Sequence, residues 1–142
     1  MIDRSALMGS LAGLPARLAA AARTAPSAPP APGEWTASDI VRHLIAVETE
    51  VWHPRLAQLV AEEHPRWPWA EPGRWADEPD ASLDRLLAVH AAERATTLAI
   101  LAGLDDAGWA RTGTHATYGV LDAAGLMTRL VDHDEEHLRS LG

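Results

Sequence analysis

Two histidines near the end of the chain have the spacing of a shared metal site. His133 and His137 are four residues apart, and residues with this spacing lie one above the other on one face of an α-helix. Their face is otherwise apolar, because it continues a stripe formed by Leu126 and Leu130 and leads on to Leu141. Imidazoles on a core-facing stripe need polar partners, and a single metal ion would serve both.

The histidine pair alone is weak evidence for a metal, because an inward-facing histidine is more often a hydrogen-bonded core residue. The HExxH pattern of zinc proteases does not occur, since the residue after His133 is Asp134. Asp134 is a candidate for orienting a histidine ligand or for accepting a proton as a general base. A solvated carboxylate is the alternative, and it is favoured for Glu135 and Glu136 in the same acidic run.

A third histidine, His43, lies in a segment whose helical start is well marked. Thr36 and Asp39 form a variant of the capping box, which predicts a helix that begins at Thr36. By helical geometry His43 lies within about 60° of Ile40 and about 40° of Val47, which both belong to the apolar face. We therefore expect His43 to face the core.

If the helices that carry His43, His133 and His137 are neighbours, the three imidazoles can form one site in the interior. Three neutral imidazoles leave coordination positions for water or substrate, which is the pattern of catalytic rather than structural zinc. Nickel, cobalt, copper and iron also accept imidazole, so the ligand type does not select the metal. A metal held in this way lowers the pKa of a water or thiol that binds to it.

Apolar periodicity predicts helices in four parts of the chain, separated by connectors without strand-like alternation. We expect Pro54 to kink the second helix rather than to end it. A long irregular connection, residues 64–80, should join the second and third helices, and residues 105–119 should form another connector. The pattern predicts one all-α domain, residues 1–142, that folds as a four-helix bundle. The predicted helices are residues 3–24, 36–60, 83–104 and 120–141.

The composition limits the classes of function. The chain has 142 residues, of which 47% are hydrophobic and 23% are charged, as in a globular protein with one core. It contains no cysteine, so a metal site must use histidine or carboxylate ligands. The net charge of −8 disfavours nucleic-acid binding, and no apolar run approaches the length of a membrane span. The apolar run that follows Asp3 is interrupted by Pro15 and Arg17, so we expect a cytoplasmic rather than an exported protein.

Other polar residues of the predicted helices have weaker functional interpretations. Glu48 lies about 140° from His43, so we expect it to pair with Arg94 inside the bundle, with an exposed acid as the alternative. Glu50 lies on the His43 face about 10 Å further along, where it could contact a substrate. His90 could face the cavity, although an ordinary surface or core position is favoured. The histidines of the kink and the connectors are expected to be exposed: His53, His64 and His115.

The long connector contains Trp67, Trp69 and Trp75. Tryptophan is common both in ligand cavities and in protein interfaces. These three side chains are therefore candidates to cover the metal cavity or to fill a dimer interface. Simple anchoring of the loop against the bundle is an equally favoured alternative.

Three segments of the chain, taken together with their order and spacing, resemble the DinB/YfiT-like superfamily of metal-dependent enzymes. This family is distinct from the DNA polymerase that shares the name DinB. The first segment carries the capped helix with His43, the second closes the third helix, and the third is the closing helix with the histidine pair. Together they span nearly the whole chain. They read PAPGEWTASDIVRHLIAVETEVW (30–52), LDDAGWAR (104–111) and GVLDAAGLMTRLVDHDEEHLRSL (119–141).

The resemblance implies a four-helix bundle with a long crossover between the second and third helices. It also implies a divalent-metal site, with zinc or nickel as the expected ion, at the positions of His43, His133 and His137. Some members of the family are transferases or isomerases that use a low-molecular-weight thiol, and homodimers are common among them. We therefore expect a homodimer that acts on a small-molecule substrate by a thiol-dependent transfer. A metal-dependent hydrolase and a non-catalytic, stress-associated binding protein are the alternatives.

For a thiol cofactor with carboxylate or sugar groups, the connectors offer candidate anchors. These are Arg66, Arg74 and Arg111. No nucleic-acid or membrane partner is expected.

Overall fold

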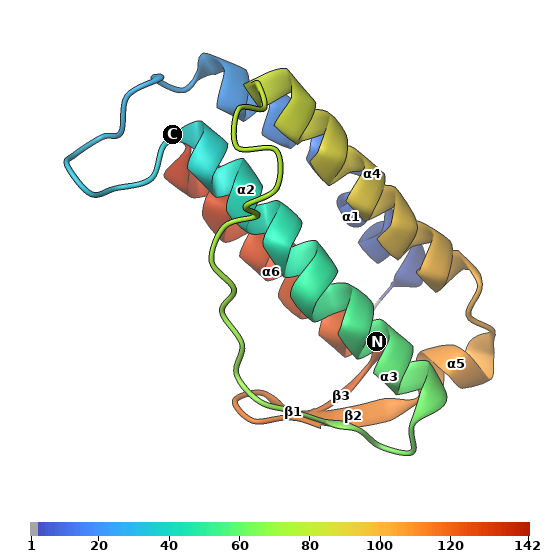
Figure 1. Ribbon diagram of the computed structural model, residues 1–142. Coiled ribbons are helices and arrows are strands. Elements are labelled where there is room, and N and C mark those ends of the chain that lie inside the picture. Colours follow the sequence, from blue (N-terminus) through green and yellow to red (C-terminus); the bar gives the residue numbers. More distant parts are fainter. Residues whose placement is uncertain (1–2) are drawn as a thin grey trace.

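Four long helical segments lie along one another in the computed structural model, which describes residues 3–142 (Figure 1). The predicted four-helix bundle is therefore confirmed. The first, third and fourth segments are single helices, and the second is a continuous run of three helical stretches. The segments are α1 (Arg4–Thr24), then α2 (Ala37–Val47), η1 (Glu48–Trp52) and α3 (His53–Ala61), then α4 (Leu83–Ala102), and α6 (Ala123–Ser140).

Side-chain caps fix the starts of the helices. The capping box predicted for α2 is present: Thr36 Oγ1 accepts a hydrogen bond of 3.2 Å from the Asp39 backbone N–H, and Asp39 Oδ2 accepts one of 3.0 Å from Thr36 N–H. Ser82 caps α4 through the backbone N–H of Arg85. The start predicted for the last helix was wrong by three residues, because Asp122 caps α6 at Ala123.

The second segment changes its winding before Pro54 instead of simply kinking. Residues Glu48–Trp52 form a π turn, in which the backbone N–H of His53 bonds to the carbonyl of Glu48, five residues back. Pro54 has no N–H and its ring crowds the carbonyl four residues before it, so a regular α-turn is unfavourable there. A π turn contains one extra residue, and the helix continues beyond it as α3 with Pro54 in its first turn.

The extra residue rotates everything that follows it relative to α2. In a regular α-helix Arg55, twelve residues after His43, would lie about 120° from it around the helix axis. Because the π turn takes up one residue, Arg55 behaves as if it were eleven residues away and lies within about 20° of the His43 direction. By the same arithmetic Val51 replaces Glu50 on the His43 face. Glu50 is exposed and Val51 is buried, so the substrate contact predicted for Glu50 was wrong.

A small sheet closes one end of the bundle, which the sequence analysis did not predict. It contains β1 (Arg66–Trp67), β2 (Thr112–His115) and β3 (Gly119–Asp122), in the order β1-β2-β3. β1 pairs in parallel with β2, and β2 pairs antiparallel with β3. A short helix, α5 (Asp106–Ala110), precedes β2. Residues 105–119 are thus a structured element rather than a connector.

Trp67 fixes the sheet to the bundle. Its ring is buried, and its Nε1–H donates a hydrogen bond of 3.0 Å to Oε1 of Gln58 in α3. Gly113 of β2 lies under this ring so closely that a Cβ at that position would collide with it. The connection from α3 to α4 passes this sheet and returns along the length of the bundle, as Figure 1 shows. α4 therefore begins at the same end as α2, which confirms the predicted long crossover.

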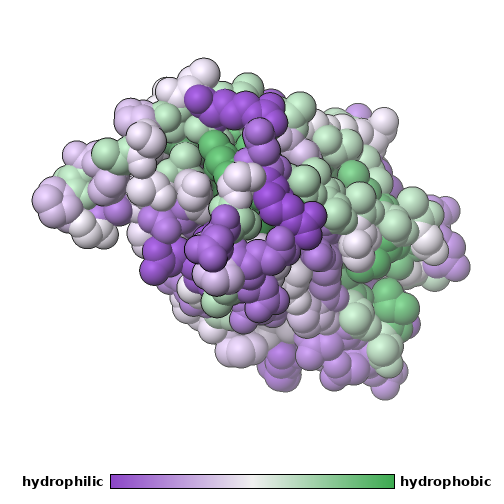
Figure 2. Space-filling view, turned by 45° about the horizontal axis from the view of Figure 1, so that its top comes forward, coloured by the Kyte–Doolittle hydropathy of each residue, from purple (hydrophilic) through white to green (hydrophobic). Residues whose placement is uncertain are grey.

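The bundle packs through α1, which contacts both α4 and α6, while α2 packs against α4. Apolar residues fill the interior in two clusters, including Leu11, Leu18, Ile45 and Leu126. Figure 2 shows hydrophilic and hydrophobic residues mixed over one face, with the hydrophilic residues densest across its middle. Among the residues described, no helix has the length and apolar character needed to cross a bilayer.

Candidate metal centre and its cavity

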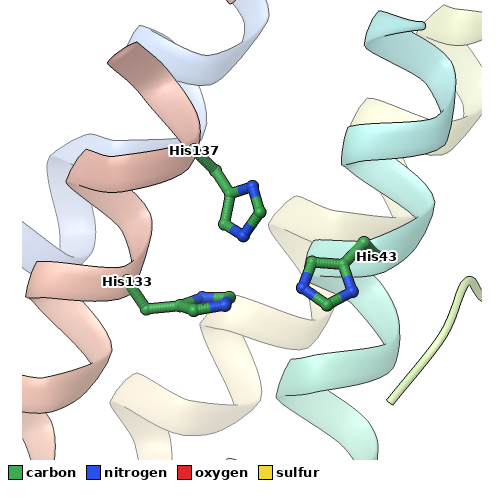
Figure 3. A group of neighbouring side chains, drawn as sticks. All are labelled: His43, His133 and His137. Carbon is green, nitrogen blue, oxygen red and sulfur yellow. The ribbon is translucent and has the colours of Figure 1, made fainter. Parts of the chain in front are cut away.

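The structure brings His43, His133 and His137 together at the end of the bundle where α2 begins and α6 ends. One side-chain nitrogen of each lies within 4.8 Å of those of the other two. Their ring centroids are separated by 4.5 Å for His133 and His137, and by 5.4 and 4.9 Å from His43 to each of them. Figure 3 shows the three imidazoles pointing toward one another from the two helices.

The hydrogen bonding of His43 leaves its Nε2 free to bind a metal ion. Nδ1 lies 2.9 Å from the carbonyl oxygen of Gly73 in the long connection. A carbonyl only accepts, so Nδ1 of neutral His43 carries the proton and Nε2 keeps its lone pair. A backbone carbonyl that orients a histidine in this way is typical of metal-ligating imidazoles.

Burial keeps the other two imidazoles neutral. Desolvation, followed by the influence of His137 and His43, lowers the pKa of His133 to about 3. Burial and His43 also lower the pKa of His137, against the opposite effect of Glu136 and Glu71. Nδ1 of His133 is buried and has no hydrogen-bond partner among residues 3–142. Neutral imidazole is the form that binds a metal ion.

Asp134 lies away from this cluster. Asp134 is 3% exposed, and its carboxylate pairs with Arg94. Nη2 of Arg94 lies 3.1 Å from Oδ1 and 3.0 Å from Oδ2. Arg94 also bonds to Glu48, as predicted. Burial raises the pKa of Asp134 to about 6, against the effect of Arg94. Asp134 does not line the cavity described next, so the structure places it in the ion-pair network of the core and not where a general base would act.

A cavity of about 340 Å³ opens on the three histidines and extends along α2, η1 and α3 toward the sheet. One wall comes from the second helical segment, one from α6, and the remainder from the long connection and the β2–β3 turn. Its lining residues are His43, Val47, Val51, Trp52, Arg55, Trp69, Ala70, Glu71, Pro72, His115, Tyr118, Leu126, Arg129, Asp132, His133, Glu136 and His137.

Several residues proposed from the sequence lie elsewhere. Arg74 pairs with Asp39, and Arg111 donates to the carbonyls of Leu59 and Glu62. Neither arginine lines the cavity, and nor does Arg66, which is exposed on β1. The predicted anchors were therefore wrong for this cavity.

Of the three connector tryptophans, one covers the cavity and two anchor the connection to the bundle. Trp69 lines the cavity, as one alternative required, and Trp67 is a core residue that anchors the connection. Trp75 packs against the second apolar cluster, and its backbone N–H bonds to Arg42, so it also anchors the connection.

The histidines outside the cluster were only partly predicted. His64 is exposed, as expected. His53 is half-buried and bonds to Thr97 and to the carbonyl of Glu93. His115 is 4% exposed and lines the cavity, and His90 is buried outside it. The expectation of exposure was wrong for His115 because β2 buries alternate residues, including this one.

Arg55, Arg129 and Tyr118 complete the cavity wall and were not predicted as site residues. Arg129 lies four residues before His133, so it continues the stripe of the histidine pair. That spacing was a usable signal in the sequence. Arg55 gave no such signal, because its position depends on the π turn.

Comparison with known proteins agrees with this architecture. Residues 7–141 match the sequence model of the DinB superfamily. The chain belongs to the DinB superfamily. Among solved structures, YfiT from Bacillus subtilis matches with a TM-score of 0.75 and 22% identity, over 97% of this chain and 85% of that one. YfiT is described as a probable metal-dependent hydrolase with an unusual four-helix bundle topology. No curated protein sequence matches the chain significantly.

Membership of the DinB superfamily confirms the resemblance found in the sequence. The structural likeness to YfiT confirms the four-helix bundle. At 22% identity this likeness shows the fold alone.

Proposed function

We propose that this DinB-superfamily protein binds one divalent metal ion through His43, His133 and His137 and is a metal-dependent enzyme for a small molecule. The observation that carries the proposal is the convergence of three ligand nitrogens within 4.8 Å at the end of a cavity of about 340 Å³. A bound divalent ion would supply Lewis acidity, which lowers the pKa of a coordinated water or thiol.

The donor set fits a metal ion. His43 has a fixed tautomer with a free Nε2, and burial keeps His133 and His137 uncharged. Three nitrogen donors leave coordination positions for water or substrate, which is typical of catalytic sites for zinc. Nickel is also compatible with three imidazoles, so we propose zinc or nickel.

We propose hydrolysis as the reaction class, because the cavity offers carboxylates beside the histidines. Glu71 and Glu136 line the wall, and both act electrostatically on His137. Either carboxylate is therefore placed to accept a proton at this end of the cavity. This assignment replaces Asp134, whose carboxylate is held by Arg94. The related structure YfiT is described as a probable metal-dependent hydrolase, which supports the same class.

Thiol-dependent transfer is the second candidate, and the shape of the cavity favours it. Val47, Val51, Trp52 and Leu126 give the cavity an apolar wall between the histidines and the arginines. A wall of this kind can hold the body of a thiol cofactor whose sulfur reaches the metal.

Metal analysis tests the proposal directly. Protein purified without an affinity tag and reconstituted separately with zinc and nickel should retain close to one ion per chain, and His43→Ala should retain far less. His64→Ala, which changes an exposed histidine outside the cavity, is the matched control. Equal metal content in all three proteins would overturn the proposal.

The reaction class is separated by substrate profiling of the metal-loaded protein. Turnover of small esters or amides without added thiol would favour hydrolysis, and consumption of electrophiles only with added thiol would favour transfer. Either activity should be lost in His133→Ala. Activity that survives this substitution would show that the three-histidine site does not carry the reaction.

A further inference from the structure

Arg55 is a buried cation without a carboxylate partner. It is 7% exposed, and within residues 3–142 its guanidinium makes one hydrogen bond, from Nη2 to the Pro68 carbonyl at 2.9 Å. It also lies over the ring of Trp52, with Cζ 5.7 Å from the centroid. Burial lowers the pKa of Arg55, and no acidic group offsets this effect. A buried charge that stays unpaired is costly, so an arginine in this state within a cavity points to an anionic ligand.

Arg55 faces the cavity only because of the π turn. The extra residue of that turn moves Arg55 from about 120° to within about 20° of the His43 direction. His43, Val47, Val51 and Arg55 consequently line one wall, with the histidine at one end and the arginine at the other. At about 1.5 Å per residue, the two backbone positions lie roughly 17 Å apart along the helix.

The groups around Arg55 are hydrogen-bond donors with free N–H groups. The buried Nε1 of Trp52 and the buried Nε of Arg129 have no partner among the described residues. His115 accepts at Nδ1 from the backbone N–H groups of Thr117 and Tyr118, so its neutral ring carries the proton on Nε2. All of these residues line the same cavity.

The acidic residues of the wall lie mostly at the other end. Glu71 and Glu136 influence His137, whereas Arg55 influences His115. The exception is Asp132, an exposed residue whose carboxylate lies 3.6 Å from Nη2 of Arg129. Asp132 offsets part of the charge of Arg129 and leaves Arg55 uncompensated. The cavity is therefore polarised, with carboxylates beside the histidines and unpaired donors beside the sheet.

We propose that the Arg55 end of this cavity binds the carboxylate of an elongated, largely apolar substrate whose other end reaches the three histidines. A carboxylate matches the planar fork of arginine. Its single negative charge suits one uncompensated cation better than a phosphate dianion does, given the nearby Asp132. The apolar wall of Val47, Val51 and Leu126 suits a hydrocarbon or aromatic body. This inference extends the proposed function by naming the substrate class.

The carboxylate site is tested on chelator-treated protein, so that its outcome does not depend on the metal. NMR titration should show that octanoate binds at least tenfold more tightly than octanamide, which has a similar shape and no charge. Arg55→Met should weaken octanoate about tenfold or more and leave octanamide nearly unchanged, as expected for loss of a charge-assisted hydrogen bond. Arg66→Met, which removes an exposed arginine outside the cavity, is the matched control and should bind octanoate as the parent protein does.

Two further measurements keep the result interpretable. Arg55→Lys retains the charge and should recover part of the octanoate affinity even if Arg55→Met is poorly folded, which thermal unfolding will show. A metal-loaded sample is titrated with mercaptooctanoate and with octanoate. Tighter binding of the thiol only in the presence of metal would place the two ends of the ligand as proposed. Equal affinities for octanoate and octanamide, or an octanoate affinity that is unchanged in Arg55→Met, would overturn the carboxylate site while leaving the metal site standing.

Discussion

Nε of Arg94 donates a hydrogen bond of 2.8 Å to Oε1 of Glu48, and both side chains are 1% exposed. This buried pair joins α4 to the π turn. Arg94 also contacts Asp134 of α6 and donates to the carbonyl of Leu11 in α1, so this one side chain of α4 bonds to the other three helical segments. The arrangement fixes the relative positions of α2 and α6, which carry the three histidines.

Replacement of Arg94 should therefore be among the most destabilising single changes in the chain. Arg94→Met leaves two buried carboxylates without a cation, which typically costs about 3 to 5 kcal/mol of unfolding free energy. Urea denaturation measures the loss. Arg85→Met removes an exposed pair with Glu78 that water screens, so its loss of stability should be far smaller. Similar losses in the two variants would contradict a central role for Arg94.

The sequence predicted the site better than it predicted the cavity, for a physical reason. His43, His133 and His137 lie on regular helical stretches, where spacing and apolar neighbours determine the direction of a side chain. The pairing of Glu48 with Arg94 followed from the same geometry. Arg55 lies beyond the π turn, and a shift of one residue there changes its direction by about 100°.

The small sheet was missed because its strands are too short for a periodic pattern. Thr112–His115 has four residues, and the ring that covers its Gly113 belongs to Trp67, which is far away in the sequence. His115 was consequently assigned to an exposed loop. Pro54 inside a continuing apolar pattern was the available sign of irregular winding, but it does not reveal whether a kink or a π turn results.

Metal binding should stabilise the fold through the histidine cluster. At a free zinc or nickel concentration of about 100 times the dissociation constant, the unfolding free energy should rise by about 2.7 kcal/mol. His137→Ala removes one of the three donors, so its thermal midpoint should respond far less to the same ion. Calorimetric or fluorescence-detected unfolding measures the shift, and His64→Ala serves as the control. A stabilisation of His137→Ala as large as that of the parent protein would argue for a different site.

His90 should make stability depend on pH below the usual histidine range. It is 1% exposed without a hydrogen-bond partner among the described residues, and burial followed by Arg94 lowers its pKa to about 3. Below about pH 6.5 the unfolded chain binds a proton at this position that the folded chain does not, so stability is lost as the pH falls. The contribution approaches about 1.4 kcal/mol per pH unit until the pH nears the folded pKa.

Removal of the imidazole isolates this contribution from those of the other histidines. His90→Leu should lose less stability than the parent protein between pH 6 and pH 4, which lies between the unfolded pKa of 6.5 and the folded pKa of about 3. Its stability at about pH 8 should be equal or higher, because a buried polar group without a partner is removed. Parallel curves for the two proteins, from denaturation series in matched buffers, would show that His90 is protonated in the folded state.

The packing of Trp67 on Gly113 should make that glycine intolerant of a side chain. A Cβ on Gly113 would collide with the indole ring, so Gly113→Ala should cost about 1 to 3 kcal/mol through displacement of the ring or the strand. Gly9→Ala is the control, because its added Cβ meets nothing within 4 Å on the exposed side of α1. In a helix this change should stabilise by about 0.5 to 1 kcal/mol. Chemical denaturation will show whether each substitution lowers or raises the free energy of unfolding.

The π turn predicts an unusual tolerance to deletion. Removal of exposed Glu50, combined with Pro54→Ala so that a regular α-helix can form, leaves Arg55 eleven residues beyond His43 along the helix and about 20° from its direction. The cavity wall and the core contacts after the turn should then be preserved. The expected loss of stability is about 1 to 3 kcal/mol, within the range of ordinary substitutions.

Deletion of exposed Ala95 from the regular helix α4 is the contrasting case. It should rotate Thr97 and Leu101 by about 100° out of the core and abolish cooperative unfolding in urea. The deletion in the π turn should also retain the preference for octanoate over octanamide, because Arg55 still faces the cavity. If both deletions unfold the protein, or if the π-turn deletion folds but loses this preference, the extra residue does more than set the direction of Arg55.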